Sequence, residues 1–218
     1  MPPFFISQMH RSMKPIYILT LFFILAITTS GSAQRKSWAV GFQIGENFST
    51  LTGENAYDYR PGISGGFHLS HYLLNDLVIR LEVSLDSRGT QLNPSLNADP
   101  FGANEYRLTY LSLPIMLRYS TESRIKFIAG GGMSVDFLLA DQVGFNGSGQ
   151  SGSPDFRPFN TDLIGCVGGA YPINDRVALS AEVRSVFAMQ TADRPDGVAS
   201  RLGRFFSWEI LFGLNYYL

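Results

Sequence analysis

Apolar residues occupy alternate positions at the carboxyl end of the chain, up to its last residue. The apolar set is Phe206, Trp208, Ile210, Phe212, Leu214, Tyr216 and Leu218. Mostly more polar residues lie between them, interrupted by Leu211. Because successive side chains of a strand point to opposite faces, this pattern predicts a strand with one continuous apolar face. Similar stripes recur upstream, and repeated segments of this kind are typical of a transmembrane β-barrel.

The same alternation predicts eight strands. Their ranges are Trp38–Leu51, Gly62–Leu74, Leu77–Gly89, Tyr106–Ser120, Arg124–Leu139, Thr161–Tyr171, Arg176–Ala188 and Arg204–Leu218. Of the seven connections, three are tight turns of turn-forming residues and four are long and rich in Gly, Asn, Asp, Ser and Pro. The long ones lie around Thr52–Pro61, Thr90–Glu105, Ala140–Asn160 and Met189–Gly203. Long and short connections alternate, which predicts long outer loops, short periplasmic turns and both ends of the barrel in the periplasm.

Parity within each strand predicts which side chains face lipid. Leu81, Ile115, Val183 and Ile210 fall on apolar faces, whereas the opposite faces carry the polar side chains. The polar sets are placed in the lumen, because Arg or Lys on the lipid face costs about 2–4 kcal/mol at mid-depth. The second and sixth strands fit either parity, so no facing is predicted for His68, His71 or Cys166.

Aromatic residues gather near both ends of the predicted strands. Near the turn ends lie Trp38, Tyr72, Tyr119, Tyr171 and Tyr216, and near the loop ends lie Phe48, Tyr106, Tyr110, Phe137, Phe187 and Phe205. Girdles at both membrane interfaces account for this distribution, and ordinary strand propensity is the alternative. Within the strands, Pro114 lacks an N–H donor and predicts a local bulge, while Gly130–Gly132 predict a bend or a close backbone approach.

The amino-terminal segment has the three parts of a secretory signal peptide. Basic residues without acids precede an apolar run at Ile16–Ile27, and small residues follow at Gly31–Ala33. We therefore expect residues 1–33 to be cleaved, leaving the barrel domain at 34–218. A single anchoring helix is the alternative, although the run is short for one. Met13 is an alternative start of translation.

Charged residues on the inward parity form the candidate functional group. They are Arg80, Glu82, Arg118, Lys126, Asp136, Glu182, Arg184 and Glu209. An eight-stranded barrel is just wide enough to be filled by side chains, and buried charges must pair. The set therefore predicts a network of opposite charges that plugs the lumen. A narrow or gated ion path is the alternative.

Other chemistry finds little support in the sequence. His68 and His71 fall on opposite faces of a strand and make a poor metal pair. Cys166 is the only cysteine, and it resembles a small strand residue more than a nucleophile. The formal net charge of −1 gives no reason to expect a nucleic-acid partner. We predict no catalytic residues, no metal and no cofactor.

Several segments resemble the PorT-type outer membrane protein beta-barrel domain family of Bacteroidetes. The resemblance rests on Tyr110–Tyr119 with its Tyr-Leu-x-apolar-Pro pattern, on Gly41–Ser49, on Leu81–Gly89 and on Ala129–Gly132. The chain end, with Gly213, Tyr216 and Leu218, is similar to the signal read by the barrel-assembly machinery, although it ends in Leu rather than Phe. The resemblance implies no catalytic residues.

Together these features predict an all-β, eight-stranded antiparallel up-and-down transmembrane barrel in a Gram-negative outer membrane. We expect a non-enzymatic protein whose four surface loops offer interaction surface to a protein partner. Its other expected partners are outer-membrane lipid and, during biogenesis, the assembly machinery. The alternatives are a small pore or component of a transport or secretion system, and a lipid-modifying enzyme. A soluble lipocalin-like barrel is the alternative fold.

Overall fold

A computed structural model of the chain describes residues 37–52, 57–74, 76–92, 105–121, 123–144, 155–192 and 203–218. The predicted signal peptide at residues 1–33 lies outside this part of the chain. The described residues belong to one compact unit, Lys36–Leu218. They include no helix that is long and apolar enough to cross a membrane.

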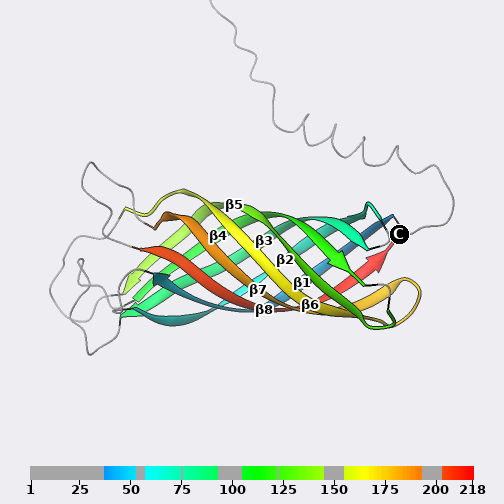
Figure 1. Ribbon diagram of the computed structural model, residues 1–218. Helices are drawn as coiled ribbons and strands as arrows, with labels where there is room; N and C mark the ends of the chain where they lie inside the picture. Colours follow the sequence, from blue (N-terminus) through cyan, green and yellow to red (C-terminus); the bar gives the residue numbers. More distant parts are fainter. Residues whose placement is uncertain are drawn as a thin grey trace, which may run out of the picture. The chain divides into compact units, whose positions relative to one another are not determined.

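Eight antiparallel strands close into a barrel in simple sequence order (Figure 1). They are β1 (Trp38–Thr52), β2 (Tyr57–Tyr72), β3 (Leu77–Leu92), β4 (Glu105–Ser120), β5 (Lys126–Gly144), β6 (Phe159–Pro172), β7 (Val177–Thr191) and β8 (Arg204–Tyr217). Closure runs through β1 and β8, whose register aligns Ala39 with Tyr217. Each strand is therefore hydrogen-bonded on both sides, and the predicted fold class is confirmed.

Alternate residues along each strand separate a filled interior from an apolar outer wall. On β4, Met116 and Arg118 are 1% and 2% exposed, whereas Ile115 between β3 and β5 is 60% exposed. The same alternation holds on β3, β7 and β8, as their parity predicts. The structure also gives the facing of the two strands whose parity the sequence leaves open. His68 of β2 and Cys166 of β6 are buried, while the ring of His71 lies against that of Trp38.

The strands extend further towards the long connections than the sequence predicts. β2 begins at Tyr57 rather than Gly62, and β3, β5 and β7 continue to Leu92, Gly144 and Thr191. These extensions lack a clear alternation of apolar and polar residues, so their sequence does not predict strands. Their backbones nevertheless pair with neighbouring strands, since an unpaired edge would leave amide groups unsatisfied. Consequently the connection predicted at Ala140–Asn160 is shorter than expected.

Two sequence expectations about local structure are wrong. Tyr106, Tyr110 and Phe205 are buried rather than in an aromatic girdle, because strand parity places them on the inward face. No bulge occurs at Pro114: the β3–β4 register is the same on both sides of it, and Pro114 pairs in register with Ser134 of β5. Register shifts occur instead between Tyr59 and Ser64, between Thr109 and Tyr110, and between Phe187 and Thr191.

Close backbone approach explains the glycines of β5. A Cβ on Gly132 would lie 2.0 Å from the carbonyl oxygen of Ile115, and one on Gly130 would lie 2.6 Å from that of Leu117. Gly130 also leaves room inside the barrel for the side chain of Arg118, whose Cγ would lie 3.0 Å from the added carbon. Small residues on β5 thus make space for a large charged group carried by β4.

Candidate functional site

The barrel interior is the candidate functional site, and its side chains lie in layers. We call the end with the long connections the loop end, and the end with the tight turns the turn end. At the loop end, inward residues of several strands form an apolar cluster. It comprises Leu51, Tyr106, Leu108, Tyr110, Phe156, Ala188, Ala192 and Phe205. Phe156 comes from the β5–β6 connection, so the expectation that all of Ala140–Asn160 is surface-exposed is wrong for this residue.

The segment that carries Phe156 is hydrogen-bonded across the loop end. The backbone N–H of Arg157 donates to the carbonyl oxygen of Ala192 at 3.0 Å. The side-chain Nε of Arg157 donates to the carbonyl oxygen of Thr191, also at 3.0 Å. The N–H of Leu138 donates to the carbonyl oxygen of Pro158 at 2.9 Å. These bonds hold the ring of Phe156 edge-on to that of Tyr106, with 5.6 Å between the ring centroids.

Next to the apolar cluster lies a layer of three aspartates around one arginine, which we call the Arg88 cluster. Arg88 Nε donates to Asp86 at 2.5 Å, while Nη1 binds Asp162 and lies 3.1 Å from Asp136. The guanidinium also lies 5.3 Å from the ring centroid of Tyr110. All three carboxylates are at most 2% exposed, so one cation holds three buried acids together.

Amide side chains complete the Arg88 cluster. Asn47 Nδ2 donates to Asp86 at 2.5 Å, and Asn160 Nδ2 donates to Asp162 at 2.9 Å. Asp136 is held by its ion pair with Arg88. Around it, Oδ1 of Asn47 and of Asn160 and the hydroxyls of Ser112 and Ser134 are buried without a hydrogen-bond partner among the described residues. Burial without a partner is costly, so this layer is polar but incompletely satisfied.

A second charged layer lies nearer the turn end, and we call it the arginine layer. Arg184 donates from Nη1 and Nη2 to the two carboxylate oxygens of Glu82, each at 2.7 Å. Its Nε donates to Glu182 at 2.6 Å. Glu182 is also bound by Arg118 Nη2 from β4. Arg80 Nη1 lies 3.7 Å from Glu82. Three arginines from three strands therefore share two glutamates across the interior.

Neutral polar groups join this layer to the turn end. Arg80 donates to Ser70 Oγ at 3.1 Å and to Asn215 Oδ1 at 3.3 Å. The same Asn215 oxygen lies 2.9 Å from His68 Nε2, and Asn215 Nδ2 donates to Ser180 at 3.0 Å. The layer is thus tied to β2 and β8 as well as to the strands that carry its charges, β3, β4 and β7.

The predicted lumen residues separate into several groups. Arg80, Glu82, Arg118, Glu182 and Arg184 meet in the arginine layer, and Asp136 belongs to the Arg88 cluster. Lys126 lies at the turn end, with Nζ 5.2 Å and 5.9 Å from the ring centroids of Tyr217 and Tyr72. Glu209 is buried, at 4% exposure, and β-pairing aligns it with Arg184 of β7 and Asn47 of β1.

Sequence reasoning missed Arg88 and Asp162, which are central to the first charged layer. Arg88 already lies within the predicted strand Leu77–Gly89 and continues the inward parity of Glu82 and Asp86, so following that parity to the end of the strand would have found it. Asp162 shares the parity of Cys166 on β6, where the glycine-rich sequence hides the alternation.

Histidines and carboxylates do not form a metal site in the described part of the chain. No group of three or more His, Cys, Asp or Glu side chains there is arranged to hold a metal ion. At the Arg88 cluster a guanidinium already lies among the aspartates.

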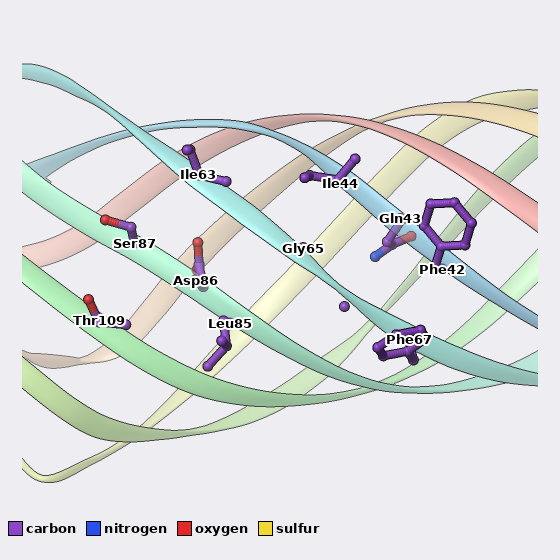
Figure 2. Close-up of a pocket in the computed structure, with 11 residues that line it drawn as sticks. Phe42, Gln43, Ile44, Ile63, Gly65, Phe67, Leu85, Asp86, Ser87 and Thr109 are labelled. Atoms are coloured by element: carbon purple, nitrogen blue, oxygen red, sulfur yellow. The ribbon is translucent and has the colours of Figure 1, made fainter.

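The outer wall carries a shallow groove of about 480 Å³ across β1, β2 and β3 (Figure 2). Gly65 pairs in register with Ile44 and Leu85, and its missing side chain leaves the wall open between Ile63 and Phe67. Nearby, Glu46 is exposed on the outer parity of β1. The register aligns it with Ile63 on one side and Ile210 on the other.

The predicted assembly residues lie at the closing seam of the barrel. Tyr216, on the outer parity of β8, is 39% exposed, and Leu218, directly after β8, is 64% exposed. The N–H of Leu218 donates to the carbonyl oxygen of Trp38 at 3.0 Å. Gly213 takes the inward parity, where an added Cβ would lie 2.8 Å from Ser180 Oγ.

Comparison with known proteins gives this arrangement a family. The model of the outer membrane protein beta-barrel domain family matches residues 31–192, well over half of the chain. The chain belongs to this family. Its place is therefore the outer membrane, with the apolar wall towards lipid. No curated protein matches the sequence.

Solved structures show the same barrel at low sequence identity. Neisserial surface protein A is 14% identical, with a TM-score of 0.54 over 84% of this chain and 97% of that protein. OprG of Pseudomonas aeruginosa is 13% identical, with a TM-score of 0.53 over the same shares. These likenesses support the eight-stranded outer-membrane fold.

Proposed function

We propose that this protein is a non-enzymatic outer-membrane barrel whose interior is closed and whose outer loops present an interaction surface. The observation that carries the proposal is the layered filling of the interior. Apolar side chains occupy the loop end, and two charged layers occupy the space behind them. A barrel filled in this way provides a rigid anchor, and its long connections are the part that can present a binding surface.

The two charged layers support closure more strongly than either would alone. Arg88 and Arg184, from β3 and β7, are each 2–3% exposed and bind carboxylates on other strands. Opening a path would strand buried charges, which costs several kcal/mol for each broken pair. The fold therefore favours a filled interior over a permanently open one.

Planar-bilayer recording of the refolded protein tests this proposal. We expect no steady single-channel conductance, because apolar side chains fill the loop end and the charged side chains behind them are joined in ion pairs across the lumen. A reproducible ohmic conductance would show that the lumen is a pore. In that case Glu182→Gln should alter ion selectivity without lowering stability, and the transport or secretion role would replace the anchoring role.

The remaining sequence expectations form part of the same proposal. We propose that residues 1–33 are removed on export, that the tight turns face the periplasm, and that the assembly machinery reads Gly213, Tyr216 and Leu218. Within the family we propose the PorT-type branch of Bacteroidetes, on the segments that resemble it. The protein partner would bind at the outer loops, and nucleic acid has no place in the proposal.

A further inference from the structure

A small cationic pocket opens at the turn end of the interior. It has a volume of about 20 Å³ and is lined by ten residues, among them Arg80, Arg118, Lys126, Tyr72 and Tyr217. Three of the lining residues are cations and none is an acid. The pocket lies on the far side of the arginine layer from the aspartates of the Arg88 cluster.

Arg118, which lines this pocket, has unpartnered donors. Its Nη2 binds Glu182, but its Nε and Nη1 are buried and have no hydrogen-bond partner among the described residues. The residue is only 2% exposed. Buried guanidinium N–H groups without acceptors carry a substantial free-energy cost, and an acceptor in the pocket would remove it.

The ion pairs beside the pocket contain more arginines than glutamates. The ion pairs of the arginine layer join Arg80, Arg118 and Arg184 to Glu82 and Glu182 only. Both glutamates are already shared by two arginines, so these five groups carry one net positive charge. The other buried acid nearby, Glu209, aligns with Arg184 and with Asn47, so it lies on the side of the Arg88 cluster and does not line the pocket. Lys126 adds another positive charge at the pocket, where its Nζ lies over the rings of Tyr72 and Tyr217.

We propose that this pocket binds one small monovalent anion of halide size. The free N–H groups of Arg118 donate to it, and Arg80 and Lys126 supply the surrounding positive field. Size selects the class of ligand, because a space of about 20 Å³ holds one water-sized particle. The pocket shares Arg80 and Arg118 with the arginine layer and is otherwise lined by residues near the turn ends of the strands, so binding there needs no open path through the lumen.

Bromide is a suitable probe for this proposal. Anomalous scattering from bromide shows where the ion binds in crystals, and the rise in Tm with bromide concentration measures the affinity of the protein for it. The refolded protein is titrated with sodium bromide against sodium gluconate at constant ionic strength. We expect a saturable rise in Tm with bromide and an anomalous peak in the pocket beside Arg118. Lys126→Gln should weaken bromide binding by about fivefold or more, the effect expected from removing one nearby unit charge.

Two further variants separate binding from folding. Arg124→Gln removes an exposed charge from the neighbouring turn, outside the pocket, and should leave the bromide affinity unchanged. Arg118→Lys keeps a charge for Glu182 but lacks the spare guanidinium donors, so the folded variant should lose the anomalous peak. The proposal is overturned if wild-type crystals show no bromide in the pocket, or if Lys126→Gln and wild type bind bromide equally.

Discussion

Glu182 illustrates how individual residues hold the interior together. Its two carboxylate oxygens bind arginines from different strands, Arg118 of β4 and Arg184 of β7. The residue is 5% exposed, so neither guanidinium can turn to solvent if the carboxylate is lost. Replacing one member of such a pair is costly mainly because the other charge is then left buried without a partner, rather than because the pair itself contributes much net free energy.

Glu182→Gln and Arg184→Met should each destabilise the folded barrel by about 3–5 kcal/mol. The double variant should cost less than the sum of the two, because it removes both members of one pair. Thermal unfolding of the refolded protein in detergent measures all three. Arg124→Met, an exposed position on a tight turn, is the control and should change stability by no more than about 0.5 kcal/mol. Fully additive losses would show that Glu182 and Arg184 do not act as a pair.

At the scale of the strand, parity predicts facing well where apolar and polar residues alternate clearly. It places Ile115 outside and Arg118 inside β4, as found. It fails at β6, where glycines replace the apolar partners, and at the loop-end extensions, where apolar residues occur both against the interior cluster, as Tyr57 does, and on the exposed surface, as Tyr59 does. The contacts across the lumen, such as Arg88 with Asp162, depend on the register between strands. A single sequence does not encode that register in any local pattern.

The lipid-facing belt gives a prediction for single strands. Ile115 lies between Leu81 of β3 and Met133 of β5 in the register. Ile115→Arg should therefore cost about 2–4 kcal/mol of folding free energy in bilayers, as a cation on the lipid face. Ile210 is a poorer test site, because an arginine there would pair with Glu46 on the neighbouring strand.

Gln91→Arg provides the matched control for Ile115→Arg. Gln91 is exposed near the loop end of β3 and pairs in register with Glu105. An arginine at that position should cost no more than about 1 kcal/mol. Folding into lipid vesicles at increasing urea concentration compares the two variants. Equal tolerance would mean that Ile115 does not face the hydrocarbon.

For the whole molecule, the alternation of tight turns and long connections sets its orientation in the membrane. An epitope tag inserted between Gly147 and Ser148, in the β5–β6 connection, should be stained on intact cells. A tag inserted after Asn174, in the tight turn before β7, should be stained only after the outer membrane is permeabilised. The reverse pattern would invert the proposed topology.

Closure of the interior is the central claim for the molecule, and its single cysteine reports on it directly. Cys166 is 5% exposed on the inward face of β6 and packs with Met116, Ile164 and Val186. We predict that a small charged methanethiosulfonate leaves Cys166 unmodified in the folded barrel and modifies it fully in urea. Cys166→Ser/Ser123→Cys, which moves the thiol to an exposed turn, should react rapidly in the folded state. Modification of Cys166 in the folded protein at a similar rate would contradict a closed lumen.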